Sequence, residues 1–375
     1  MSAQERSNLH INTNRHPTST SITKKEYSST QSNMQLITVT VTILAMVTSV
    51  LSKCECGFRD EVGRTWMDGL VVPFDKVADL TTSPDLYLHE YIQSSPLDNI
   101  PYHVINANSY KDASDLVLKV SAATSESKTI LSSKVSSRRK DLFYGTYRSL
   151  IELPTQVGST CVGFFTFFND TQEIDIEYIG QKPDMLYFST KSSNVADIAH
   201  LNYRYGAGLE GQFHDYRFDW LPGQVDFFVN DALKFTTKDS VPVEPARWML
   251  MNWANGSNDW SGLPSTDSLT RAKNVRVFFN STHPYVISGF ASACAANPNS
   301  MCDVATFPAN ELYGYEQNAI RNHVVKNGND QPDTSIYNND RNRGTATSAS
   351  SNDQGLMGKF VSALVALAIV IRMVL

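Results

Sequence analysis

Short runs of β-forming residues dominate the chain between about Cys54 and Ala305. The runs contain about four to eight residues rich in Val, Ile, Phe, Tyr and Thr, without a long apolar repeat of helical period. Successive runs lie roughly 8 to 15 residues apart, which favours an antiparallel β-sandwich. Pro222 and Gly223 within Leu221–Gln224 predict a type II turn that joins two strands into a hairpin. The predicted strands are Leu116–Val120, Ile130–Val135, Phe143–Leu153, Val162–Phe168, Glu173–Ile179, Met185–Thr190, His214–Trp220, Val225–Val229, Trp248–Trp253 and Val275–Asn280.

Composition excludes two classes of protein. Apolar residues make up 41% and charged residues 19% of the 375 residues, so the chain can bury a packed core and is not disordered throughout. The formal net charge of −6 lacks the basic excess that neutralises nucleic-acid phosphates. We therefore expect a folded protein that does not bind nucleic acid.

The N-terminal part of the chain carries an export signal. The uncharged apolar run at residues 34–52 follows two lysines and ends with Val50 and Ser52 at the spacing of a cleavage site, which predicts a signal peptide. An uncleaved signal anchor is the alternative, because about 18 apolar residues can span a bilayer. Residues 1–33 are polar and predict a disordered extension or a misplaced start codon.

The C-terminal residues 352–375 end in the apolar run Phe360–Ile371. A polar spacer and the small residues Thr345–Ser350 precede this run, and that order predicts a signal for a glycosylphosphatidylinositol (GPI) anchor at a eukaryotic cell surface. An apolar helix docked on the domain is the alternative. Residues 311–351 are mostly polar and predict a stalk that follows a folded domain at residues 53–310.

Five cysteines and three glycosylation sequons fit an exported protein. The short loop between Cys294 and Cys302 predicts a disulfide. The other cysteines, of which one is left over, are Cys54, Cys56 and Cys161. The sequons predict glycans on Asn169, Asn255 and Asn280.

The segment Gln172–Gly180 has acidic residues at alternate positions. Because alternate side chains of a strand share one face, Glu173, Asp175 and Glu177 are expected to lie together while apolar neighbours point the other way. Acidic residues are poor strand formers and repel one another on one sheet face, so stability alone does not explain them. The alternatives are a solvated edge strand and a metal site, although the segment contains no histidine ligand.

Glycoside hydrolysis needs two carboxyl groups that flank one bond, about 5 to 5.5 Å apart in retaining enzymes. The α-carbons of Glu173 and Glu177 would be about 13 Å apart on a strand, so their side chains must lean together over Asp175. A concave sheet makes this easier. Repulsion among the three acids keeps one carboxyl neutral near neutral pH, as a general acid requires.

Further segments carry a resemblance to a known family, over roughly residues 110–285. The chain resembles glycoside hydrolase family 16, which includes lichenases and fungal cell-wall glucanases and transglycosylases. This resemblance implies a concanavalin A-like jelly-roll sandwich of two antiparallel sheets with a concave substrate cleft. The matching segments are the EIDIEYIG string at Glu173–Gly180, the YG-containing Phe143–Tyr147, the strand Gly163–Phe168, the FHDYRFDW string at Phe213–Trp220, and Met249–Gly256 followed by Asp259 and Trp260.

The resemblance implies a role for each acid. Glu173 would be the nucleophile, Glu177 the general acid and then base, and Asp175 the residue that tunes the nucleophile. Aromatic faces suit sugar rings, although core packing is the alternative for each aromatic residue taken alone. The candidate substrate-binding residues are Arg148, Phe165, Phe167, Tyr187, Ser189, Trp253 and Trp260.

These observations predict a secreted, GPI-anchored, monomeric enzyme that hydrolyses β-linked glucan with retention, as an endo-1,3(4)-β-glucanase does. One alternative is a cell-wall transglycosylase that links glucan to glucan or chitin, and another is a non-catalytic carbohydrate-binding jelly roll or structural wall protein. No cofactor or catalytic metal is expected. Parts of the family bind a structural calcium ion, but no motif of this chain indicates one.

Overall fold

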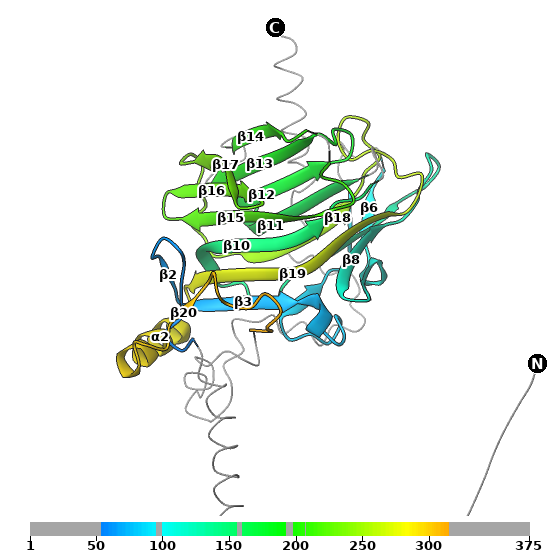
Figure 1. Cartoon of the computed structure of the whole chain (residues 1–375). Coiled ribbons are helices and arrows are strands. Elements are labelled where there is room, and N and C mark those ends of the chain that lie inside the picture. Colours follow the sequence, from blue (N-terminus) through cyan, green and yellow to red (C-terminus); the bar gives the residue numbers. More distant parts are fainter. Residues whose placement is uncertain (1–53, 95–99, 156–159, 193–197, 207, 315–375) are drawn as a thin grey trace, which may run out of the picture. The chain divides into compact units, whose positions relative to one another are not determined.

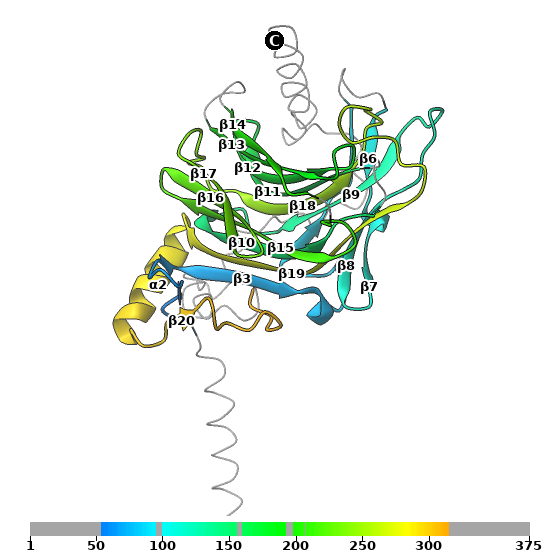
Figure 2. The same cartoon turned by 45° about the horizontal axis from the view of Figure 1, so that its top comes forward.

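The computed structural model describes residues 54–94, 100–155, 160–192, 198–206 and 208–314. The predicted signal peptide, the anchor signal and all but the start of the predicted stalk lie outside these residues. Within them, most strands belong to two large sheets stacked as layers (Figures 1 and 2). The prediction of an all-β, two-sheet sandwich is therefore confirmed.

The first of these layers, here called the front sheet, carries the acidic segment. Its strands pair antiparallel except β6 with β9, which are parallel. In spatial order it contains β14 (Ile198–Arg204), β13 (Met185–Ser192), β12 (Gln172–Ile179), β11 (Cys161–Asn169), β18 (Arg247–Trp253), β9 (Ile130–Ser137), β6 (Tyr102–Val104) and β5 (Tyr91–Gln93), with β4 (Leu86–Leu88) also paired to β9.

The second layer, the back sheet, is antiparallel throughout its described pairs. In spatial order it contains β17 (Ala232–Thr237), β16 (Gln224–Val229), β15 (Phe213–Leu221), β10 (Leu142–Glu152), β19 (Ser268–Ser281), β8 (Asp115–Val120) and β7 (Ser109–Asp112), with β3 (Asp68–Pro73) also paired to β19. The chain also contains two short 3₁₀ helices. Phe74–Lys76 (η1) precedes β4, and Asn106–Asn108 (η2) precedes β7.

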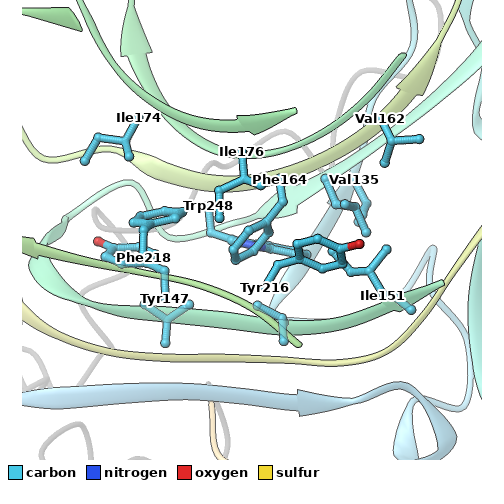
Figure 3. Packing of buried hydrophobic residues seen from close by; sticks show 14 of the residues in the cluster. Val135, Tyr147, Ile151, Val162, Phe164, Ile174, Ile176, Tyr216, Phe218 and Trp248 are labelled. Atoms are coloured by element: carbon cyan, nitrogen blue, oxygen red, sulfur yellow. The ribbon is translucent and has the colours of Figure 1, made fainter. Parts of the chain in front are cut away.

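The main core fills the space between the two sheets. Phe164, Ile176 and Trp248 from the front sheet pack with Tyr147 and Phe218 from the back sheet, and all five are at most 3% exposed (Figure 3). Each fully buried side chain of this size stabilises the fold by about 1.5–3 kcal/mol. Alternate side chains of the central strands point into this core.

The hairpin between β15 and β16 forms as predicted. β15 ends at Leu221, β16 begins at Gln224, and Gly223 has φ of 72°, the left-handed conformation that a type II turn requires at that position. The ten predicted strands are all present, nine of them within two residues of their predicted bounds, whereas β19 begins seven residues before the predicted Val275. The strands β3 to β7, β14 and β17 were not predicted.

A small third sheet joins the two ends of the described chain. β1 (Phe58–Arg59) pairs with β2 (Thr65–Trp66) and, in parallel, with β20 (Cys302–Asp303), which follows the helix α2 (Pro284–Ala296). The sequence does not predict α2, because its small residues lack a clear apolar period. Among the described residues, no helix is both long and apolar enough to cross a bilayer.

The predicted Cys294–Cys302 disulfide is wrong. The structure pairs Cys54 with Cys302 and Cys56 with Cys294, and Cys161 is free. β1 brings the N-terminal cysteines beside β20 and α2, so both bridges join distant segments rather than close a short loop. Such pairing depends on the folded arrangement of the two ends, which loop length in the sequence does not reveal.

These disulfides generate a stability prediction. They link residues 248 and 238 positions apart, so each restricts the unfolded chain strongly. The paired substitution Cys56→Ser with Cys294→Ser should lower the free energy of unfolding by about 2–5 kcal/mol, measured by denaturant titration. Peptide mapping without reduction should recover both long-range links, and a peptide that joins Cys294 to Cys302 would contradict the assignment.

Candidate active site

Strand β12 presents the three acidic residues on the face of the front sheet that lies away from the main core. Its intervening side chains Ile174 and Ile176 belong to that core and are 0% and 3% exposed. Glu173, Asp175 and Glu177 therefore share the opposite face, as the alternation predicts. Glu173 is only 4% exposed, and the other two acids are partly buried.

The neighbouring strands flank each acid with a defined pair of side chains. β11 and β13 both run antiparallel to β12, and residues directly opposite one another lie on the same face. The facing residues are Phe167 and Lys191 for Glu173, Phe165 and Ser189 for Asp175, and Gly163 and Tyr187 for Glu177. Aromatic, cationic and hydroxyl side chains thus line one row of carboxyl groups.

Two side chains outside β12 donate hydrogen bonds to the acids. Ser189 Oγ lies 3.1 Å from Asp175 Oδ2, and Cys161 Sγ lies 3.6 Å from Glu177 Oε1. Asp175 also shares a hydrogen bond with Glu173. The central acid is therefore held from two sides, while Glu177 is held by the thiol.

Burial and neighbouring charges set the protonation of Glu173 and Asp175. It raises the pKa of both carboxyl groups, and repulsion from Glu173 and then Glu177 raises the pKa of Asp175 further. The cation Lys191 opposes the effect of burial on the pKa of Glu173, and Lys134 opposes it too. Burial outweighs both cations, so the pKa of Glu173 rises to about 8. The hydrogen bond between the two acids lowers the pKa of Glu173 and raises that of Asp175, which places the shared proton on Asp175.

Glu177 is suited to hold a proton near neutral pH. Burial raises the pKa of this carboxyl to about 7, and the hydrogen bond from Cys161 opposes that rise. A general acid must still hold its proton near the pH at which it works, and a pKa near 7 meets that requirement. The site can therefore support two-carboxylate chemistry.

Most of the predicted aromatic residues gather on the acid-bearing face. Phe165, Tyr187, Trp253 and Trp260 belong to a second buried cluster there, and Phe167 packs against it. Tyr187 and Trp260 have ring centroids 5.7 Å apart. Phe165, Trp253 and Trp260 are no more than 5% exposed, so much of their surface packs within the protein, and Phe167 keeps more exposed surface.

Arg148 does not lie with the acids, and its prediction as a residue of that site is wrong. Tyr147 on β10 points into the main core, so Arg148 next to it points away, to the outer side of the back sheet. Its Nε lies 2.7 Å from Asp215 Oδ2, and its Nη2 lies 2.7 Å from Asp231 Oδ1. There it lines a charged cavity of about 370 Å³ that contains none of the three acids.

The three glycosylation sequons differ in exposure. Asn169 is exposed at the end of β11, and Asn280 on β19 is partly buried and accepts a hydrogen bond from the Met67 amide. Asn255 is fully buried, and its Oδ1 accepts hydrogen bonds from the Ser257 amide and from Ser261. The predicted glycan at Asn255 is wrong for the folded chain, because the glycan would have to leave through a packed interior.

Comparison with known proteins finds a family model that matches part of this chain. The family model for glycosyl hydrolases family 16 matches residues 101–269, which contain the three acids. The β-glucanase of Bacillus amyloliquefaciens is 30% identical over 128 residues, which are 32% of this chain and 52% of that protein.

Other relatives bear similar names. A β-glucanase of Acetivibrio thermocellus is 30% identical over 132 residues, which are 33% of this chain and 39% of that protein. The match thus spans about half or less of the curated relatives' lengths. Among solved structures, the Bacillus licheniformis β-glucanase has a TM-score of 0.48 at 20% identity, covering 56% of this chain and 98% of that chain.

Three further residues of the candidate site were not predicted from the sequence. Lys191 is 2% exposed beside Glu173, Lys134 on β9 has its Nζ 5.7 Å from the Phe165 ring centroid, and Cys161 contacts Glu177. Lys191 lies two positions after Ser189 on β13, so the strand alternation could have found it. Lys134 and Cys161 reach the acids only through strand pairing.

The described residues contain no group of three or more His, Cys, Asp or Glu side chains arranged to hold a metal ion. The acids of β12 instead contact the hydroxyl of Ser189, the thiol of Cys161 and one another. Such contacts suit carboxyl groups that exchange protons.

The raised pKa of Glu177 generates a stability prediction. Its carboxyl has an ordinary pKa of 4.5 and a folded pKa of about 7, so between these values the folded chain holds a proton that the unfolded chain releases. Stability from this group is complete below about pH 4.5 and falls as pH rises through about 7. Between pH 4.5 and 8, the free energy of unfolding of Glu177→Gln should therefore fall by about 1–3 kcal/mol less than that of wild type.

Urea unfolding at a series of pH values measures this difference. Glu244→Gln makes the same chemical change at an exposed residue and should leave the wild-type pH dependence unchanged. An unaltered pH dependence in Glu177→Gln would show that the carboxyl is not buried as described.

Proposed function

We propose that this domain is an endo-acting glycosidase that cleaves β-linked glucan with retention of configuration. The observation that carries the proposal is the row of three carboxyl groups on β12, with Glu173 and Glu177 on either side of Asp175 and with Lys191 facing Glu173. A retaining mechanism needs two carboxyl groups that flank one bond, one that attacks as a carboxylate and one that donates a proton. The relatives' names, β-glucanases, support this substrate class.

In the first step, Glu177 donates its proton to the glycosidic oxygen while the Glu173 carboxylate attacks the anomeric carbon. The glycosidic bond breaks, a glycosyl–Glu173 ester forms, and the shortened sugar leaves with the proton. Asp175 supports this step because its hydrogen bond keeps Glu173 oriented. Its proton also lessens the repulsion that two adjacent carboxylates would have.

In the second step, Glu177, now ionised, removes a proton from water, and the water oxygen attacks the anomeric carbon. The ester bond to Glu173 breaks, and both carboxyl groups return to their starting state. Two inversions at the same carbon give net retention. Lys191 favours the return of negative charge to Glu173, because its cation faces that carboxylate from the neighbouring strand β13.

Phe167 is the aromatic residue best suited to contact a sugar ring. It faces Glu173 from the neighbouring strand β11 and keeps exposed surface, whereas Phe165, Trp253 and Trp260 pack deeply around the acids. We assign the buried aromatics to a wall that keeps water from the carboxyl groups and strengthens their electrostatic interactions. Tyr187, beside Glu177, completes that wall on β13.

A transglycosylase is the alternative enzyme function. It shares the Glu173 ester and differs only in the second step, where a sugar hydroxyl of glucan or chitin replaces water. Mass spectrometry of the products from one defined β-1,3/1,4-glucan oligosaccharide separates the two reactions. Only shorter products indicate hydrolysis, whereas products longer than the input indicate transfer.

The cellular setting is part of the proposal. An export signal at residues 34–52, an anchor signal at 352–375 and the exposed sequon at Asn169 support a GPI-anchored glycoprotein that remodels the cell wall. Two disulfides support an oxidising compartment. We propose that the protein acts as a monomer without a cofactor.

Substitution of the two glutamates tests the catalytic assignment. Glu173→Gln should lower kcat/KM on β-glucan at least about 10⁴-fold, because it removes the attacking carboxylate. Glu177→Gln should cause a similar loss on glucan but keep the first step on an aryl β-glucoside, whose leaving group needs no proton.

The exposed substitution Glu244→Gln serves as the matched control and should keep wild-type activity on both substrates. A carbohydrate-binding domain without catalysis would instead bind glucan and give no product in wild type or any variant. Normal turnover of glucan by Glu173→Gln would rule out its role as nucleophile.

A further inference from the structure

Cys161 differs from every other cysteine that the structure describes. The other four form the two disulfides that join the ends of the domain, whereas Cys161 is free and 0% exposed. It is the first residue of β11 and lies opposite Ile179 on β12 and Trp253 on β18, on the acid-bearing face. Its position is therefore inside the proposed active site, although the mechanism above does not use it.

The thiol of Cys161 contacts the proposed acid directly. Its Sγ lies 3.6 Å from Glu177 Oε1, within the range of a hydrogen bond to sulfur. Among the residues that the structure describes, no other side chain or backbone amide donates a hydrogen bond to Glu177. Without this contact, packing alone would set the orientation of the Glu177 carboxyl.

The thiol keeps its proton and can remain a donor. Burial raises the pKa of Cys161 well above its usual range, and the charge of Glu177 raises it further. A neutral buried S–H group donates a weak hydrogen bond and is a poor nucleophile. Its chemistry therefore fits a permanent donor to a neighbouring carboxyl rather than a covalent catalyst.

We propose that Cys161 is a positioning residue, whose S–H group holds the Glu177 carboxyl in place for proton transfer to and from the glycosidic oxygen. This proposal rests on the glycosidase function above. A weak donor suits the task, because a strong donor to the ionised form would favour the carboxylate and leave less of the acid protonated. Cysteine thus orients Glu177 at little cost to its proton affinity.

Other groups also face Glu177 and remain unchanged when Cys161 is replaced. Asp175 and Glu173 approach it along β12, Tyr187 faces it from β13, and Lys134 on β9 acts on the same acid cluster through Glu173. Their contributions are common to wild type and variants. A difference between variants at residue 161 therefore reports the donor at that position.

Two substitutions by residues of similar size should shift the pKa of Glu177 in opposite directions. Cys161→Ser introduces a stronger O–H donor, which should move the basic limb of the kcat/KM profile for glucan to lower pH by about half a unit or more. Cys161→Val fills the site without a donor, so the basic limb should move to higher pH and kcat should fall about 3- to 30-fold.

The experiment uses the full chain and two readouts. The first is the pH profile of kcat/KM on β-glucan, with kcat on an aryl β-glucoside as a reference for a first step that needs no proton donor. The second is the carboxyl ¹³C NMR titration of Glu177, assigned by loss of its signal in Glu177→Gln. Opposite shifts of the Glu177 titration in Cys161→Ser and Cys161→Val support the proposal.

Coincident Glu177 titrations in wild type and both folded variants would overturn the proposal. The NMR titration also separates this inference from the glycosidase proposal, because it needs no turnover. If wild type fails to cleave any glucan while the two variants still shift the titration, the function is wrong and the thiol contact holds. If Cys161→Val fails to fold, Cys161→Ser alone decides, since an unshifted titration in that variant contradicts the hydrogen bond.

Discussion

The two-residue alternation of β12 is the constraint on which the site depends. Ile174 and Ile176 fill the space between the sheets, while the acids between them occupy the opposite face. A shift of register by one residue would bring the carboxyl groups into the main core and expose the apolar side chains, so the register is strongly specified. Packing of the core therefore keeps the three carboxyl groups side by side, although they repel one another.

Proton sharing and nearby cations make this crowding tolerable. Asp175 holds the proton that it shares with Glu173, Lys191 opposes the effect of burial on the pKa of Glu173, and Glu177 keeps a proton up to about neutral pH. Burial strengthens every one of these interactions because the surroundings have a low dielectric constant. The burial that raises these pKa values thus costs stability as pH rises and keeps protons available on one strand.

The sequence predicts what local patterns determine and misses what distant pairing determines. The alternation of Gln172–Ile179 predicts both faces of β12, and Pro222 with Gly223 predicts the β15–β16 turn. The disulfides of Cys294 and Cys302 join segments more than 230 residues apart, so a short-loop argument fails. The prediction for Arg148 is wrong for a related reason. Arg148 lies on β10 of the back sheet, across the core from the acids.

Covalent trapping tests the central claim, that Glu173 attacks the sugar. A 2-deoxy-2-fluoro β-glucan oligosaccharide with a good leaving group forms the glycosyl ester and slows its hydrolysis, so the adduct can be found by mass spectrometry of the intact chain and its peptides. The account predicts one fluoroglycosyl group on Glu173, absent from Glu173→Gln. An adduct on any other residue, or glucan turnover with no adduct from this reagent, would contradict it.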